Sequence, residues 1–132
     1  MKQVLRNKDS GGAWTRYQKS FFHAIDGIVY AIRYEHNMII IFICSVLVLI
    51  LGMLLNLSPQ EWLFCILIIG LIMATELINS AIEAVVDLAS PKLHPLAKIA
   101  KDTASGATLI FCLISLIGGI IIFLPKIMNL LS

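Results

Sequence analysis

The sequence predicts an all-α integral membrane protein, with an N-terminal amphipathic surface helix followed by three transmembrane helices. Hydrophobic residues make up 59% of the 132 residues and charged residues only 14%, which does not suit a soluble domain of this length. Three segments each supply about the 20 mostly apolar residues that a bilayer-spanning helix needs. A single domain over residues 1–132 accounts for the whole chain.

The amphipathic helix is predicted over residues 13–34. Apolar side chains recur from Trp14 to Ile32 at spacings of three and four, and polar and basic side chains do the same on another face. A helix with this pattern lies in the membrane interface, where its aromatic residues act as anchors and its basic face meets the headgroups.

The three transmembrane helices are predicted over residues 38–56, 60–88 and 95–124. Ser58, Pro59 and Glu61 supply an N-cap, a proline in the first helical turn and a capping-box acid for the second of them. Gly118 and Gly119 in the third either bend that helix or let a neighbour approach closely.

The charges predict the orientation of the chain. Of the ten Lys and Arg residues, six precede the first transmembrane helix, three lie in residues 89–102, none lies in 56–61, and the last is Lys126. Because basic residues favour the cytoplasmic side, the N-terminus and residues 89–102 are expected in the cytoplasm of a multi-pass membrane protein.

A row of polar side chains marks the second transmembrane helix. Glu76, Asn79, Glu83 and Asp87 stand at i, i+3, i+7 and i+11, which places them within an arc of about 80° on one helix face. Carboxylates at the end of a membrane helix are costly and therefore indicate a functional site. The alternative is a set of interfacial charges at a helix end, which would suit Asp87 alone.

The charged residues expected on the cytoplasmic side favour phosphoryl transfer. Acids that hold Mg²⁺ and cations that hold phosphates occur together there. The sequence contains no Gly-x-x-x-x-Gly-Lys segment and no kinase-type glycine-rich loop, so a nucleotide site must be built from helix ends and side chains. Glu76 and Glu83 are about 10 Å apart along the helix, so they would flank a transferred phosphoryl group rather than chelate one ion.

The segment from Glu76 to Asp87, together with residues 94–102 (His-Pro-Leu-Ala-Lys-Ile-Ala-Lys-Asp), closely resembles the small bacterial diacylglycerol kinase family, which includes undecaprenol kinases. The likeness covers nearly the whole chain. It implies a lipid kinase of the bacterial cytoplasmic (inner) membrane, a homotrimer whose active sites combine helices of neighbouring subunits. It also implies Mg²⁺ and ATP as cofactor and co-substrate, and phosphorylation of a membrane lipid alcohol on the cytoplasmic side.

The resemblance assigns roles to individual residues. Glu76 matches the general base that activates the lipid hydroxyl, Asn79 the polar residue one turn beyond it, and Asp87 a supporting acid. Glu35 and Glu83 match the acids that hold the metal. The implied ATP-binding residues are Arg16, His23, Glu35, Glu83, Lys92, Leu93, His94, Lys101 and Asp102. The implied substrate-binding residues are Arg16 and Glu76.

Other interpretations stay open for these residues. Arg16 would anchor to anionic lipid, Lys101 and Asp102 would form an ion pair at a helix start, and Asn79 would make a packing hydrogen bond. The rival function is a small oligomeric proton-coupled transporter with Glu76 as the proton carrier, and a purely structural subunit is a third. Residues 94–98 and 121–126 look more like those of the undecaprenol kinases, and this resemblance favours undecaprenol over diacylglycerol as the substrate.

Overall fold

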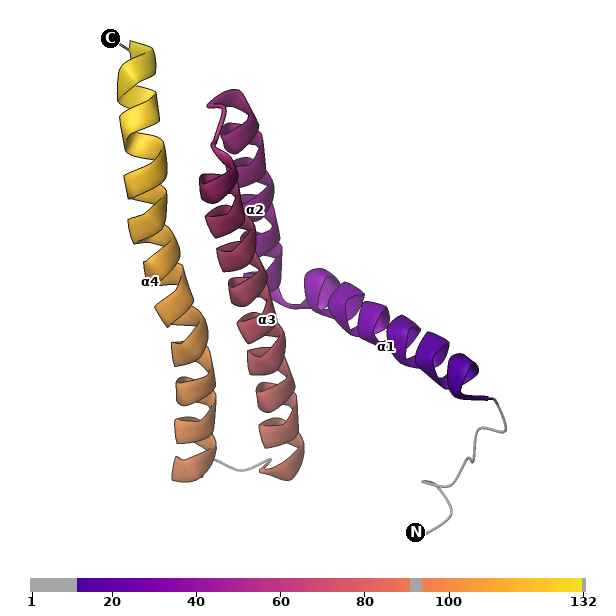
Figure 1. Ribbon diagram of the computed structural model, residues 1–132. Coiled ribbons are helices and arrows are strands. Elements are labelled where there is room, and N and C mark those ends of the chain that lie inside the picture. The colour runs from indigo at the N-terminus through magenta and orange to yellow at the C-terminus, as the bar shows by residue number, and fades with distance from the viewer. Residues whose placement is uncertain (1–11, 91–93, 132) are drawn as a thin grey trace.

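The computed structural model describes residues 12–90 and 94–131, which form four helices and no strand (Figure 1). The helices are α1 (Ala13–Tyr34), α2 (His36–Leu54), α3 (Pro59–Ala89) and α4 (Pro95–Leu131). Of these, α2, α3 and α4 are long and apolar enough to cross a membrane. The prediction of an all-helical chain with three helices able to span a membrane is confirmed. The place of α1 at the membrane surface stays a prediction.

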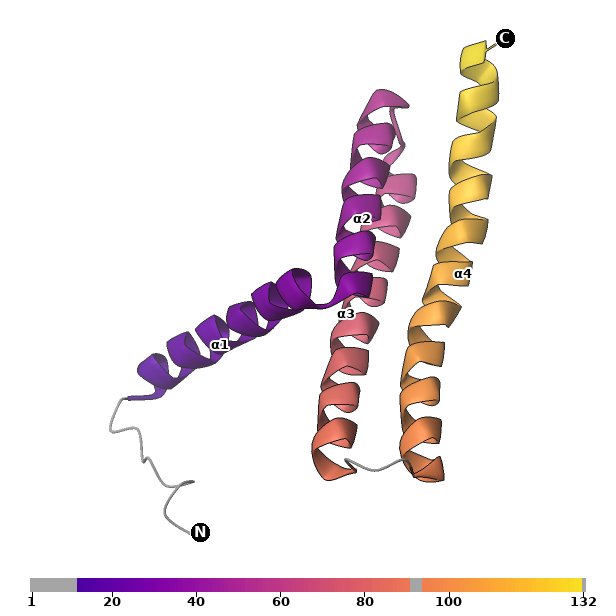
Figure 2. The ribbon, with the colours of Figure 1, turned by 180° about the vertical axis from the view of Figure 1, so that it is seen from behind.

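The three long helices lie side by side, and α1 leaves them at a wide angle, as both views show (Figures 1 and 2). The end of α3 and the start of α4 lie at one end of this bundle, and the α2–α3 turn lies at the other (Figure 1). Since α2 has 19 residues and α3 has 31, α3 continues beyond the start of α2 on the side from which α1 departs. This part of α3 carries the polar row.

The α2–α3 turn follows local rules at both helix ends. Asn56 adopts the left-handed conformation (φ 50°), and the N–H groups of Asn56 and Leu57 donate to the carbonyls of Met53 and Gly52, which is a Schellman motif. Ser58 and Glu61 then form both hydrogen bonds of a capping box at the start of α3. The predicted cap is therefore confirmed.

Two glycines let aromatic rings pack closely between helices. A Cβ atom placed on Gly52 would lie 2.8 Å from the Trp62 ring, and one on Gly118 would lie 2.2 Å from the Phe64 ring. Gly119 has nothing within 4 Å of such an atom. Of the two functions predicted for the glycine pair, a close approach is confirmed at Gly118, and the neighbour is α3.

The last helix is longer than the sequence pattern predicted. α4 continues through Pro125 to Leu131, beyond the predicted end at residue 124. A proline in a helix costs one backbone hydrogen bond, and membrane helices tolerate it where neighbouring groups compensate. Lys126, the next residue, forms an ion pair with Glu61 of α3 (3.1 Å), which holds this end of α4 against α3.

Candidate active site

The polar row on α3 changes from buried to exposed along the helix. Glu76 and Asn79 are only 4% and 3% exposed, Glu83 is half-buried and Asp87 is exposed. Asn79 Nδ2 donates to Glu83 Oε1 (3.0 Å), as expected for side chains one turn apart on a single face. Asn79 Oδ1 is buried without a partner among the described residues. The Glu76 carboxylate accepts no hydrogen bond from those residues either.

The exposed end of the row is tied to α4. Asp87 Oδ1 lies 2.6 Å from Lys101 Nζ, and this ion pair joins the last turns of α3 to the first turns of α4. Asp102 pairs instead with Lys98, one turn before it on α4. Lys101 and Asp102 therefore do not pair with each other, contrary to the helix-start interpretation. Each has a separate acidic or basic partner.

A cavity of about 240 Å³ lies beside Glu76, between α2, α3 and α4. Its lining residues are Asn37, Ile40, Ile41, Glu76, Ser105, Thr108, Leu109 and Cys112. The wall contributed by α4 carries polar groups at i, i+3 and i+7, namely Ser105, Thr108 and Cys112. The Glu76 carboxylate thus meets a cavity between the helices that has both polar and apolar walls.

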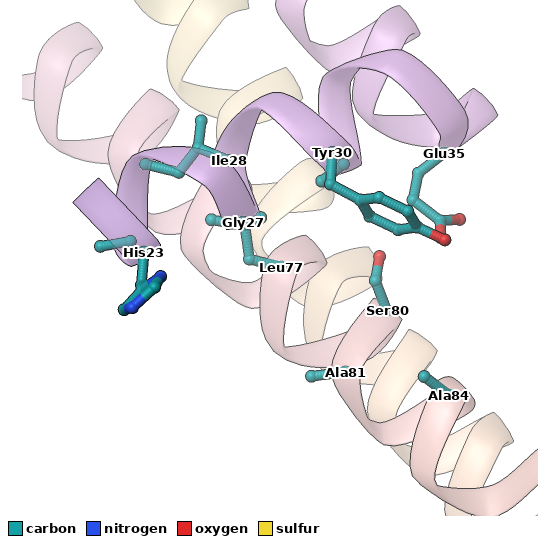
Figure 3. Close-up of a pocket in the computed structure, with 11 residues that line it drawn as sticks. His23, Gly27, Ile28, Tyr30, Glu35, Leu77, Ser80, Ala81 and Ala84 are labelled. Carbon is teal, nitrogen blue, oxygen red and sulfur yellow. The ribbon is translucent and has the colours of Figure 1, made fainter. Parts of the chain in front are cut away.

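A second cavity, of about 400 Å³, lies between α1 and α3. Figure 3 shows His23 at one end of it, and Tyr30 and Glu35 at the other end near Ser80. Glu35 is the single residue between α1 and α2, since α2 begins at His36 rather than at the predicted 38. The corner of the chain therefore places the Glu35 side chain toward α3.

The two cavities lie on different faces of α3. Leu77, Ser80, Ala81 and Ala84 face α1, and the polar row is centred about 100° around the helix from them. Of the two acids expected to hold a metal, Glu35 lines the cavity at α1, and Glu83 lines neither of these two cavities. Within residues 12–90 and 94–131, no three His, Cys, Asp or Glu side chains are close enough to hold a metal ion.

The remaining predicted site residues are dispersed. Arg16 is exposed near the start of α1, and His23 is exposed with its Nδ1 4.0 Å from Asp26. His94 Nδ1 accepts a hydrogen bond from the backbone N–H of Leu96 (3.2 Å), so its ring caps the start of α4. The predicted ATP contacts Lys92 and Leu93 lie outside the described residues.

Sequence reasoning missed Thr108 and Cys112 as site residues. Neither residue was among the predicted site residues. Their position three and seven residues after Ser105 places all three on one face of α4, and this spacing was the available signal. It became informative only with Glu76 placed across the cavity from them.

These features define a helical membrane protein with a row of carboxylates, one of them buried, along one membrane-length helix. Residues 22–123 match the prokaryotic diacylglycerol kinase family, and the chain belongs to that family. It is 46% identical to the undecaprenol kinase of Bacillus subtilis over 122 residues. This match covers 92% of this chain and 99% of the relative. The protein is therefore a lipid kinase.

Two further relatives are named diacylglycerol kinases. The one from Synechocystis is 37% identical over 113 residues, covering 85% of this chain and 65% of the relative. The one from Helicobacter pylori is 40% identical over 95 residues, covering 72% of this chain and 74% of the relative. The family resemblance inferred from the motifs is confirmed, and the transporter and structural interpretations do not hold.

Proposed function

We propose that this protein transfers the γ-phosphoryl group of ATP to the hydroxyl of undecaprenol, with Glu76 as the general base. The observation that carries the proposal is a buried carboxylate, without a partner among the described residues, on the wall of an intramembrane cavity. Glu76 takes the hydroxyl proton as the lipid oxygen attacks the γ-phosphorus. The bond between that phosphorus and the bridging oxygen breaks, and ADP leaves with the electron pair.

Asn79 and Glu83 are proposed to carry the phosphate side of the reaction. The hydrogen bond from Asn79 occupies Glu83 Oε1, and the other carboxylate oxygen accepts none from the described residues. Mg²⁺ normally takes one or two carboxylates and completes its coordination with phosphate oxygens and water, so this donor suits a nucleotide-bound Mg²⁺. When bound, Mg²⁺ neutralises charge that develops on the phosphate oxygens. Glu35 is proposed as the second acid.

Cationic residues at the α3–α4 end are proposed to bind the nucleotide. Lys101 sits at the junction of the two helices and is held there by its ion pair with Asp87. Asp102 lies beside it. Arg16, His23, Lys92, Leu93 and His94 complete the proposed ATP-binding set, and Arg16 also contacts the lipid headgroup.

A site shared between subunits follows from the separation of these groups. Because Glu35 lines the cavity between α1 and α3 and Glu83 lies on another face of α3, we propose that a homotrimer brings Glu35 of one subunit to the polar row of the next. The outward aromatic residues of α1 agree with this, since Trp14 is 74% exposed. Mixing inactive Glu76→Gln and Lys101→Met subunits should then restore part of the activity. No recovery in verified mixed oligomers would contradict a shared site.

The cytoplasmic membrane is the proposed location, with the N-terminus and the site on the cytoplasmic side. This orientation gives the polar row access to ATP and agrees with the distribution of Lys and Arg residues. It also places the Glu61–Lys126 pair at the opposite surface.

Undecaprenol is proposed over diacylglycerol because the similarity to an undecaprenol kinase extends over nearly the whole of both chains. Diacylglycerol is the second candidate, because other relatives are named diacylglycerol kinases. Both lipids should be tested in the same micelles at equal mole fraction, with phosphate transfer measured from radiolabelled ATP. We expect a kcat/KM at least about tenfold higher for undecaprenol, and equal or higher efficiency with diacylglycerol would reverse the assignment.

A further inference from the structure

The hydroxyl of Thr108 is buried at the cavity beside Glu76, and nothing within the chain explains it. Thr108 is 7% exposed, and its Oγ1 has no hydrogen-bond partner among the described residues. Buried hydroxyl groups in proteins are normally hydrogen-bonded, so a ligand or water is expected to complete this one.

Other hydroxyl groups in these helices show the usual solution. Ser45, Thr75, Ser80 and Thr103 each donate to a backbone carbonyl one turn earlier in their own helix, at 2.7–3.0 Å. Thr108 makes no such bond and lines the same cavity as Glu76. The Thr108 hydroxyl is therefore available to donate and accept hydrogen bonds in the cavity, because it makes none to the backbone of α4.

The cavity also extends in a direction that suits a lipid chain. A second hollow of about 210 Å³ shares Ile40, Ile41 and Cys112 with it and runs toward Val48 and Ile69. Most of its lining is aliphatic. The space thus has a polar end, at Glu76 and Thr108, and an apolar continuation between α2 and α3.

We infer that Thr108 binds the hydroxyl of the lipid alcohol and holds it at the carboxylate of Glu76. This inference rests on the proposed function. Thr108 Oγ1 donates its hydrogen to the substrate oxygen, which leaves the hydrogen of the substrate hydroxyl free to point at Glu76. The residue thereby orients the lipid oxygen and takes no part in the transfer of the proton.

The test compares three variants of the full-length protein in mixed micelles. Thr108→Val keeps the side-chain shape and removes the hydroxyl, whereas Thr108→Ser keeps the hydroxyl. Thr103→Val is the matched control, because Thr103 lies on the same helix, is exposed and is bonded to the carbonyl of Ile99 (2.7 Å). KM and kcat are measured separately for undecaprenol and for ATP, and thermal unfolding of each purified variant is followed.

We expect Thr108→Val to lower kcat/KM for undecaprenol about tenfold, which corresponds to about 1.4 kcal/mol. Its KM for ATP and its thermal stability should stay close to those of the parent protein, because the hydroxyl makes no bond within the chain. Thr108→Ser and Thr103→Val should both resemble the parent. These results together would support a lipid-binding role.

Three outcomes would overturn the inference. An unchanged kcat/KM for Thr108→Val would mean that the Thr108 hydroxyl bonds only to water and not to the lipid. Equal losses in Thr108→Ser and Thr108→Val would assign the effect to packing. A Thr108→Val protein that unfolds earlier and has a raised KM for both substrates would show a structural role. Failure of the parent protein to phosphorylate either lipid would instead refute the proposed function.

Discussion

Replacing Glu76 with glutamine is expected to make the protein more stable and almost inactive. An unpaired carboxylate in a low-dielectric site carries a penalty of several kcal/mol, whereas an unpaired neutral amide costs about 1–3 kcal/mol. Glu76 is 4% exposed and has no hydrogen-bond partner among the described residues, so the substitution relieves the larger cost. We expect a gain of about 1–3 kcal/mol in the free energy of unfolding. Loss of a general base lowers turnover by about 10²–10⁴-fold.

Glu61→Gln provides the matched control with the opposite pattern. Its carboxylate accepts a hydrogen bond from the Ser58 backbone N–H (2.7 Å) and pairs with Lys126 (3.1 Å), far from the cavities that hold Glu76 and Glu35. Neutralising it weakens the start of α3 and its contact with the end of α4. The unfolding temperature should fall while kcat stays close to that of the parent protein.

Both variants are measured in one detergent, by thermal unfolding and by transfer of radiolabelled phosphate to undecaprenol. A Glu76→Gln protein that unfolds at a lower temperature would show that the carboxylate is paired in the assembled enzyme and supports the fold. Turnover within a factor of a few of the parent value would remove Glu76 from the role of base. Either result refutes the reasoning, since the two effects are derived from the same unpaired carboxylate.

Gly118→Ala should lower the free energy of unfolding in micelles by about 1–2 kcal/mol, because its Cβ would lie 2.2 Å from the Phe64 ring. Gly119→Ala, which meets no such atom, should leave it unchanged, and equal losses in the two variants would refute this reasoning. Lys101→Met should raise KM for ATP at least about tenfold, while Lys98→Met, which loses only an exposed ion pair, should leave it within about twofold. A reporter inserted at Ser58 should be found outside the cytoplasm, and cytoplasmic labelling would reverse the topology.

The fold was predictable wherever local rules decide it. Apolar runs of sufficient length fixed the three transmembrane helices, and Ser58 with Glu61 marked the start of α3 because a capping box depends on residues three apart. The end of α4 was missed because Pro125 usually stops a helix. Its continuation depends on a contact between Lys126 and α3, which has no local signal in the sequence.

The candidate site was predictable along one helix and not between helices. Periodicity alone placed Asn79 and Glu83 on one face of α3, and the structure joins them by a hydrogen bond. It gave no information on which neighbouring helix faces that row. The partner of Asp87 and the position of Glu35 on another side of α3 depend on how the helices cross, which the spacing of residues does not encode.

Buried polar groups without hydrogen-bond partners indicate the position of the active site more closely than the distribution of charged residues does. Away from the cavity beside Glu76, the capping box at Ser58 and the hydroxyl groups of Thr75 and Thr103 have their hydrogen-bond partners within the chain. At the cavity, the Glu76 side chain is buried and Thr108 Oγ1 is buried without a partner among the described residues, and one turn beyond Glu76 the same is true of Asn79 Oδ1. Each buried polar group without a partner lowers the stability of the folded protein. Because these groups occur at one level of the bundle, we infer that a ligand bound there completes their hydrogen bonds. A lipid hydroxyl and a phosphate group have the donors and acceptors to complete them.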